Sequence, residues 1–103
     1  MLQVIATIQL NPGSRVAFLE EFLKLVPLVQ AEKGCLEYFP TVDTEVSWGG
    51  LAPFREDVVV VVEKWTDLEA LKVHLTAPHM LAYRPKVKHL VVNVQLQVLT
   101  PVG

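Results

Sequence analysis

Residues 57–79, DVVVVVEKWTDLEALKVHLTAPH, join a run of five valines to a segment with helical spacing. β-Branched side chains are restricted at χ1 and favour strands, and an unbroken apolar run is typical of a strand that is buried on both faces. We therefore expect a central strand here. Because side chains alternate along a strand, Glu63 and Trp65 share one face of it with Val59 and Val61.

A helix is predicted to follow this strand. Thr66 and Glu69 fit the Ser/Thr-x-x-Glu capping box, in which each side chain accepts a hydrogen bond from the other residue's backbone N–H. The three- and four-residue spacing then predicts an inner stripe of Leu68, Leu71 and Leu75, with His74 at its edge. We therefore expect His74 to border a cavity.

Two prolines set the bounds of a second, short helix. Pro78 lacks a backbone N–H and suits the first turn of a helix, so one helix should break at residues 76–78 and another begin. His79 falls at this junction. The short helix is predicted over residues 80–84, because Pro85 limits it.

The other elements follow the same two periodicities. Strands are predicted at residues 2–10, 35–42 and 89–99, and an amphipathic helix at residues 15–33. This order is a ferredoxin-like βαββαβ layout, an α+β fold with a four-stranded antiparallel sheet. We expect the first and third strands at the centre and parallel to each other, and both main helices on one face. The second strand should lie at an edge, because it contains Pro40.

Composition limits the chain to one small domain. It has 103 residues, of which 51% are hydrophobic, and we predict a single domain over residues 1–103. The net charge of −2, with acids and bases interspersed, does not favour nucleic acid as a partner. The chain has neither a signal-peptide pattern nor an apolar run of about 18 residues, so we expect a cytoplasmic protein without membrane association.

The residues that could bind metal are few. Cys35 is the only cysteine, which excludes an internal disulfide and a multi-cysteine metal site, and we interpret it as a small buried residue rather than a nucleophile. His74 and His79 lack the i, i+4 spacing of a helical metal-binding pair, and no third ligand is evident. No metal site is therefore predicted.

Three short motifs resemble those of the antibiotic biosynthesis monooxygenase family. They are Asn11-Pro12-Gly13, Glu32-x-Gly34-Cys35-Leu36-x-Tyr38, and Glu63-x-Trp65 followed by Leu71, His74 and Pro78-His79. The resemblance implies a homodimeric α+β barrel, in which two sheets pair face to face, and a pocket between each sheet and its helices. It also implies oxygenation of a small phenol or quinol by O₂ without a metal or flavin cofactor. The haem-degrading branch uses an Asn in its first strand, and residues 2–10 contain none.

The same resemblance suggests roles around the predicted pocket. Trp65 would supply a stacking wall and an indole N–H. His74 or His79 would hold the phenolic proton, since an unperturbed pKa of about 6.5 lets histidine act near neutrality. Glu63 would orient a histidine or a substrate hydroxyl, and Tyr83 would line the pocket. Each has a plainer interpretation: Trp65 as a core residue, the histidines as helix-end residues bonded to backbone, and Glu63 as half of an ion pair.

Residues 43–56 form an unusually long connection between two predicted strands. Long loops in compact domains are often functional, and Trp48 and Phe54 would be costly to leave exposed. We expect this segment to be a lid over the pocket or an arm onto the partner subunit, with both rings contacting the substrate.

Two other functions stay open from the sequence. The dimer could bind a small molecule without turnover or have a structural role, or it could be a cofactor-free isomerase on the same fold. Oxygen uptake with quinols separates the monooxygenase from both.

Overall fold

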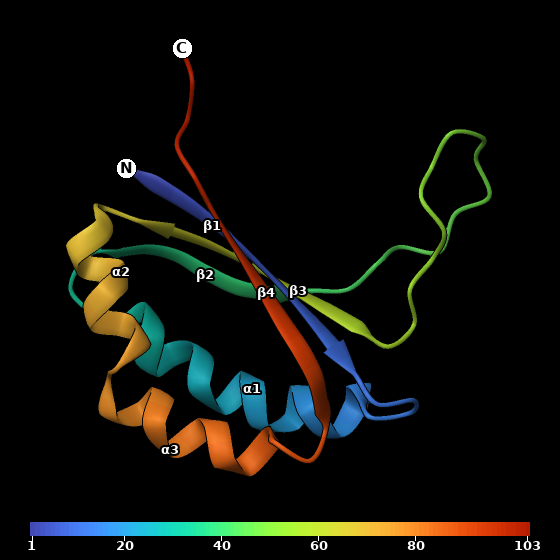
Figure 1. Cartoon of the computed structure of the whole chain (residues 1–103), viewed down its shortest axis with the longest axis horizontal. Helices are drawn as coiled ribbons and strands as arrows, with labels where there is room; N and C mark the ends of the chain where they lie inside the picture. Colours follow the sequence, from blue (N-terminus) through green and yellow to red (C-terminus); the bar gives the residue numbers. More distant parts are fainter.

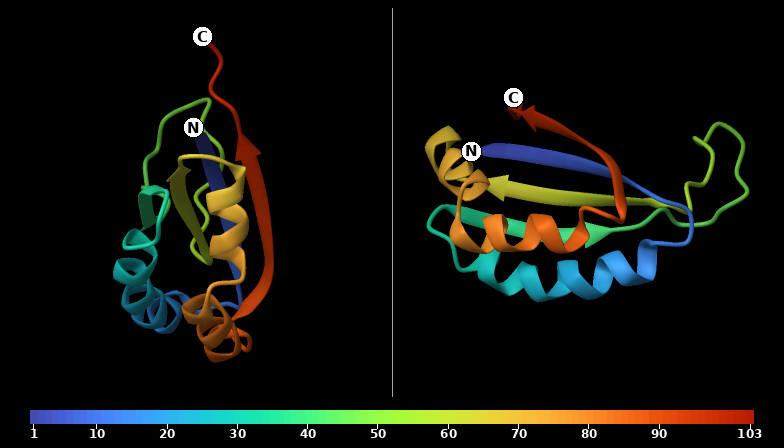
Figure 2. Two further views of the ribbon diagram at one scale, coloured as in Figure 1. Left: turned by 90° about the vertical axis from the view of Figure 1, so that its left-hand side faces the viewer. Right: turned by 60° about the horizontal axis from the view of Figure 1, so that its bottom comes forward.

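Four strands and three helices make up the chain, and the computed structural model describes all residues 1–103 (Figure 1). The elements are β1 (Leu2–Leu10), α1 (Arg15–Gln30), β2 (Cys35–Thr41), β3 (Val58–Trp65), α2 (Leu68–Leu75), α3 (Pro78–Val87) and β4 (Val91–Leu99). The strands form one antiparallel sheet in the order β2-β3-β1-β4, and the helices lie on one face of it (Figure 2). The predicted ferredoxin-like α+β fold is confirmed. None of the three helices has the length and apolar character that a membrane crossing requires.

The two central strands, β1 and β3, run antiparallel, with Ala6 opposite Val61. Their central position and the edge position of β2 agree with the prediction, but the predicted parallel direction is wrong. The α1 crossover makes β2 parallel to β1, and the connection from β2 to β3 then reverses the chain. Strand β3 therefore runs against both.

The valine run of β3 is buried most completely on the face toward the helices, although Val58 on the opposite face is also only 4% exposed. Val59 and Val61 are at most 1% exposed, whereas Val60 and Val62, on the opposite face, are half-buried. The core of 16 buried residues lies between the sheet and the helices. The outer face of the sheet has no covering element within this chain.

Four aromatic rings tie the helices to the edge of the sheet. Phe18 and Phe22 of α1 stack at 5.6 Å between ring centroids, and Phe22 stacks on Tyr38 of β2 at 5.7 Å. Tyr83 of α3 meets Phe22 edge-on at 5.8 Å. Such offset and edge-on pairs stabilise a core beyond the area they bury. They fix α1, α3 and β2 relative to one another.

Helix α2 begins one residue later than the capping-box pattern predicts. Its N-cap is Asp67, whose carboxylate accepts a hydrogen bond from the N–H of Ala70 at 2.9 Å. The N–H of Thr66 donates instead to the carbonyl of Gly34, also at 2.9 Å. The N–H of Thr66 is therefore bonded to the turn before β2 and is not available to Glu69 for the predicted capping box.

The buried faces of α2 and α3 also differ from the prediction. Leu68 is 64% exposed, whereas His74 is 2% exposed and lies inside the core rather than at its edge. Helix α3 continues through Pro85 as far as Val87. A proline removes only one bond of the helical ladder, and here that loss does not end the helix.

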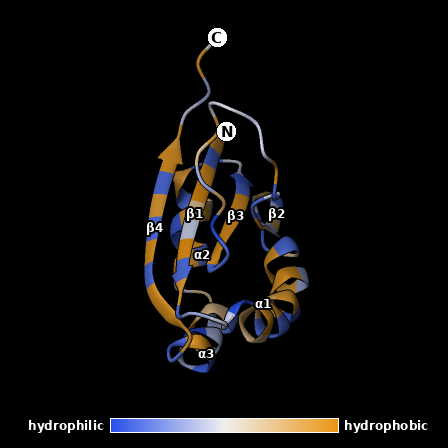
Figure 3. Cartoon of the chain, turned by 90° about the vertical axis from the view of Figure 1, so that its right-hand side faces the viewer, coloured by the Kyte–Doolittle hydropathy of each residue, from blue (hydrophilic) through white to orange (hydrophobic).

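Strand β4 carries a bulge that decides which of its side chains face the helices. Gln9 pairs with Asn93 and Leu10 pairs with Val91, so Val92 is the extra residue and breaks the predicted alternation. After the bulge, the side chains on the helix side are Val94, Leu96 and Val98. They stay about half exposed, because no helix packs closely against this strand, along which hydrophobic and hydrophilic residues alternate (Figure 3).

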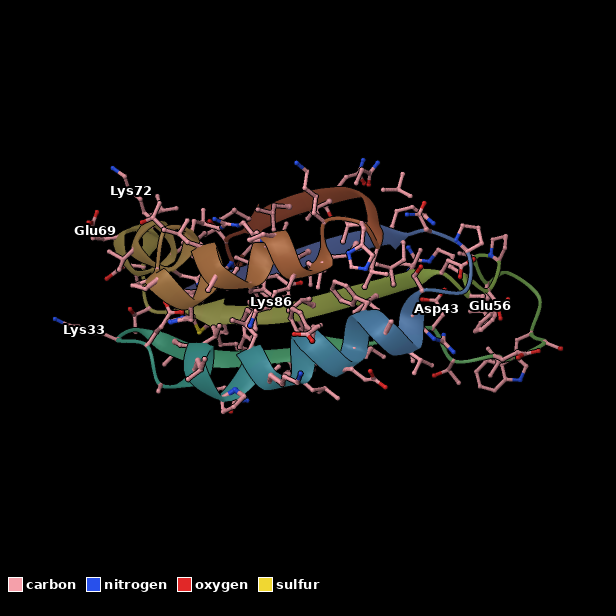
Figure 4. The ribbon with its side chains drawn as sticks, turned by 90° about the horizontal axis from the view of Figure 1, so that it is seen from below. Lys33, Asp43, Glu56, Glu69, Lys72 and Lys86 are labelled. Carbon is pink, nitrogen blue, oxygen red and sulfur yellow. The ribbon has the colours of Figure 1, made fainter.

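The long connection between β2 and β3, residues 43–56, extends away from the body of the molecule as an arm (Figure 1). Arg55 closes its base by donating to both carboxylate oxygens of Asp43, at 2.9 and 3.0 Å. Figure 4 shows Asp43 and Glu56 at this base. Beyond it, the ring of Trp48 is 73% exposed and that of Phe54 is 40% exposed.

The close approach of α2 to the turn before β2 predicts a large effect of Gly34→Ala. Gly34 has a φ of +86°, and an added Cβ would lie 2.5 Å from Cβ of Ala70 and 2.7 Å from Oγ1 of Thr66. Left-handed backbone costs about 1–2 kcal/mol and overpacking about 1–3 kcal/mol, so the free energy of unfolding should fall by about 2–5 kcal/mol in urea denaturation. Gly13→Ala is the control, since its φ is +77° and no atom lies within 4 Å. Equal losses in both variants would contradict the clash.

Candidate active site

A cavity of about 570 Å³ lies between the inner face of the sheet and helices α2 and α3. Twelve of its 17 lining residues are hydrophobic, and its size is within the range of about 300–1,000 Å³ typical of small-molecule sites. Val94 and Leu96 of β4 form the wall on the side that no helix covers. The ionisable residues that line it are Tyr38, Glu63, His74, Tyr83, Arg84 and Lys88.

Glu63 brings a carboxyl group into this apolar cavity from the central strand β3. Its side chain is 4% exposed, and its Oε1 accepts a hydrogen bond from Nε1 of Trp65 at 3.0 Å. Burial raises the pKa of Glu63 from its ordinary value to about 7, against the opposing effect of the Trp65 hydrogen bond. Glu63 can therefore bind or release a proton near neutral pH.

His74 reaches the cavity from α2. Its ring lies against Trp65 at 4.7 Å between centroids and meets Tyr38 edge-on at 5.5 Å. Burial lowers the pKa of His74, although the hydrogen bond from Nδ1 to Oε2 of Glu32, at 2.9 Å, opposes this. No protein group bonds to Nε2. The lowered pKa favours the neutral imidazole near neutral pH, and His74 lines the cavity with Nε2 free of protein partners.

Glu32 is the site residue that the sequence did not predict. It lies in the turn between α1 and β2, and the same Oε2 that contacts His74 is 2.6 Å from Nε2 of His79. Its only signal in the sequence is its place in the Glu-x-Gly-Cys motif, which contributes to the family resemblance but assigns no role to Glu32. The contact joins residues 42 and 47 positions apart, so no local pattern indicates it.

Glu32 is also the third potential metal ligand, beside His74 and His79, that was not evident from the sequence. One donor atom from each of Glu32, His74 and His79 lies within 4.8 Å of the others. The contacts of Oε2 of Glu32 with His74 and His79 are 2.9 and 2.6 Å long. These are the lengths of charge-assisted hydrogen bonds. The observed contacts are therefore those of a hydrogen-bonded group.

The predicted site residues that line the cavity are Glu63, His74 and Tyr83. Trp65 is fully buried and does not line it. Its indole donates to Glu63 and its ring lies against His74, so it supports both residues from behind. The ring of Trp65 therefore does not form the predicted stacking wall of the cavity.

The other three predicted site residues lie outside the lining. His79 contacts Glu32 but does not line the cavity, and its side chain is 23% exposed. Trp48 and Phe54 are on the arm. Their contact with the substrate stays a prediction.

Two tyrosines and one arginine add polar atoms to the cavity. Burial raises the pKa values of Tyr38 and Tyr83 far above neutrality, so both remain hydrogen-bond donors. The guanidinium of Arg84 donates to the carbonyl of Leu75 beside the cavity. Burial also raises the pKa of Cys35 to about 11, so the thiol stays protonated and is a poor nucleophile.

The sequence model of one family, described as antibiotic biosynthesis monooxygenase, matches residues 1–86. The chain belongs to this family. Membership supports a monooxygenase activity. Val94 and Leu96, the cavity wall on β4, lie beyond the residues that the family model matches.

Individual relatives in this family cover almost the whole chain. A protein of Escherichia coli K12 named probable quinol monooxygenase YgiN is 42% identical over 98% of both chains. PA3566 from Pseudomonas aeruginosa has a TM-score of 0.83 at 29% identity, over 99% of this chain and 94% of that one. Rv0793 from Mycobacterium tuberculosis has a TM-score of 0.80 at 26% identity, over 99% and 95%.

The raised pKa of Glu63 predicts how stability depends on pH. Between the ordinary glutamate pKa and about 7, the folded protein holds a proton on Glu63 that the unfolded chain has lost. The free energy of unfolding should therefore fall as pH rises through this window, by up to about 3 kcal/mol, and Glu63→Gln should lack that fall. Urea denaturation of both proteins between about pH 5 and about pH 8 measures the difference.

His74 gives a pH dependence of the opposite sign. Its lowered pKa removes stability as pH falls below the ordinary histidine range, but both proteins carry it and it cancels in their difference. Parallel stability curves for the two proteins would show that Glu63 is ionised normally in the fold.

Proposed function

We propose that this chain oxygenates a small phenol or quinol with O₂ in the cavity beside Glu63 and His74, without a metal or flavin. The observation that supports this most directly is one apolar cavity holding a carboxyl group with a pKa of about 7 and an imidazole with a free Nε2. The name of the Escherichia coli relative, probable quinol monooxygenase, indicates the same substrate class.

The proposed reaction balances with O₂ as the only oxidant. A quinol gives a hydroxyl proton to a basic group, and the quinolate passes one electron to O₂, which leaves a semiquinone and superoxide. The two radicals combine at a ring carbon, and the proton returns to the distal oxygen to give a hydroperoxide. Loss of the ring C–H proton and cleavage of the O–O bond release water, so the products are a hydroxyquinone and water.

The chain's own residues have three tasks in this scheme. Nε2 of His74 accepts the hydroxyl proton, because a neutral imidazole is a general base near neutral pH. Glu63 bonds to the second hydroxyl and exchanges protons in the same pH range. Trp65 positions both groups, and the apolar lining keeps water away from the reactive intermediates.

We also propose that two copies of the chain pair through the outer faces of their sheets. Four of the apolar side chains on that face are Ile5, Phe39, Val60 and Val62. Phe39 is 41% exposed and the other three are half-buried, so a single chain leaves an apolar surface in water. A second copy offers the same surface about a two-fold axis.

The position of residues 43–56 agrees better with an arm onto the partner subunit than with a lid over the cavity of the same chain. This segment extends away from the cavity of its own chain, so Trp48 and Phe54 would reach a substrate only in the partner subunit. We propose that it is an arm onto the partner. The cytoplasmic location expected from the sequence stays a prediction.

His74→Ala should lower turnover roughly 10²-fold or more while substrate binding falls less, because it removes the general base. Trp65→Phe should keep the fold and lose the N–H that positions Glu63, with a smaller loss of turnover. The measurement is O₂ uptake on a panel of quinols, with protein freed of metal by a chelator and of flavin. His89→Ala is the matched control, because His89 is exposed and outside the cavity.

Three results would redirect this assignment. Full activity in His74→Ala would remove the proposed base. Thermal stabilisation by a quinol without O₂ uptake would favour a binding protein, and product formation without O₂ would favour an isomerase.

The paired sheets predict a sedimentation mass of twice the 11.5 kDa chain at micromolar concentration. Val62→Glu places a charge in the proposed interface and should give monomer or unfolded protein. Leu68→Glu adds the same charge at an exposed position on α2 and should leave the dimer intact. A folded wild-type monomer at that concentration would contradict the proposal.

A further inference from the structure

The histidine that faces the cavity is held from behind by a carboxylate. Nδ1 of His74 lies 2.9 Å from Oε2 of Glu32. The side chain of His74 is 2% exposed and that of Glu32 is 11% exposed, so water competes little for this contact. Because a carboxylate accepts hydrogen bonds, the contact places the imidazole proton on Nδ1 and the lone pair on Nε2.

A second histidine holds the same oxygen. Nε2 of His79 lies 2.6 Å from Oε2 of Glu32, and His79 does not line the cavity. Two N–H donors on one oxygen fix the position of the carboxylate more narrowly than one donor does. His79 therefore acts on Glu32, and only through Glu32 on His74.

We propose that Glu32 is the positioning residue that makes His74, and not His79, the base of the reaction, with His79 as the anchor of Glu32. The proposal rests on the oxygenase function above. Glu32 would act as the carboxylate of a Ser-His-Asp triad acts: it holds one tautomer and stabilises the imidazolium that forms when His74 accepts a proton. This separates two histidines that were equivalent candidates in the sequence.

The titratable and charged groups around His74 determine its response to pH. They are Glu32 in the turn, Tyr38 on β2, Glu63 on β3, and His79 and Arg84 on α3. Burial lowers the pKa of His74 most strongly, Glu32 raises it, and His79 and Arg84 lower it. Removal of the Glu32 charge should therefore lower this pKa further.

Glu32→Gln tests the positioning role. We expect kcat to fall roughly 10²-fold or more with KM changed less than about threefold, since the base is weakened and substrate contacts are kept. The acidic limb of the kcat/KM profile should move to lower pH. Glu32→Asp keeps the charge and should recover part of the activity. Glu21→Gln is the matched control, because Glu21 on α1 pairs with Lys24 at 3.2 Å and lies outside the cavity and the proposed interface.

His79→Ala separates the two histidines. It leaves the contact between Glu32 and His74 in place, so turnover should fall less than about tenfold, against roughly 10²-fold for His74→Ala. Unchanged melting temperatures would show that all variants fold. A His79→Ala protein as impaired as His74→Ala, together with full activity in Glu32→Gln, would overturn the proposal.

The tautomer of His74 gives a measurement that does not depend on turnover. Nitrogen-15 NMR of the imidazole should show neutral Nδ1–H in the wild type near neutral pH, and a shift toward Nε2–H in Glu32→Gln. The expected tautomer in a protein that oxidises no quinol would refute the function and leave the positioning intact. An Nε2–H tautomer in the wild type would overturn the positioning whether or not the protein is active.

A metal control completes the experiment, because the three donor atoms lie within 4.8 Å of one another. The wild type is dialysed against a chelator before every measurement. Unchanged activity and tautomer support the hydrogen-bonded arrangement. Activity that is lost on dialysis and returns with Zn²⁺ would overturn the proposal in favour of a metal site.

Discussion

One carboxylate oxygen of Glu32 accepts from both His74 and His79, and this joins three segments that are far apart in the sequence. It lies in the turn after α1, its first partner is on α2 and its second is at the start of α3. The chain could not move any of these segments without breaking a nearly dry, charge-assisted bond. The direction in which the His74 ring presents its free nitrogen follows from this constraint.

Burial then acts in opposite directions on the two titratable groups that share the cavity. It raises the pKa of the Glu63 carboxyl group to about 7, above the ordinary histidine value, and lowers the pKa of the His74 imidazole below that value. Trp65 contacts both through different parts of one ring system, by its N–H and by its face. The apolar environment thus favours the uncharged form of both groups, a protonated carboxyl group and a neutral imidazole.

The sequence predicts most strongly what depends on side-chain periodicity. The strand at the valine run and the order of strands and helices follow from it, whereas the edge position of β2 follows from Pro40. It fails where two segments compete for one group: the N–H of Thr66 bonds to Gly34, so Asp67 caps α2 in place of the predicted box. It also fails for Glu32, whose partners are set by how the turn packs on α2 and α3. The predicted direction of β3 was wrong although the order of the elements determines it, because the α1 crossover makes β2 parallel to β1 and the next connection reverses the chain.

Because no helix covers the inner face of β4, the side chains on this face can change in evolution independently of the residues that transfer protons. Val94 and Leu96 line the cavity, yet both remain about half exposed and neither belongs to the buried core. Mutations on this strand can therefore alter the shape of the cavity with little effect on folding, while the proton-transfer residues sit on elements that the core holds rigid. A lineage could change its substrate through β4 and keep its chemistry.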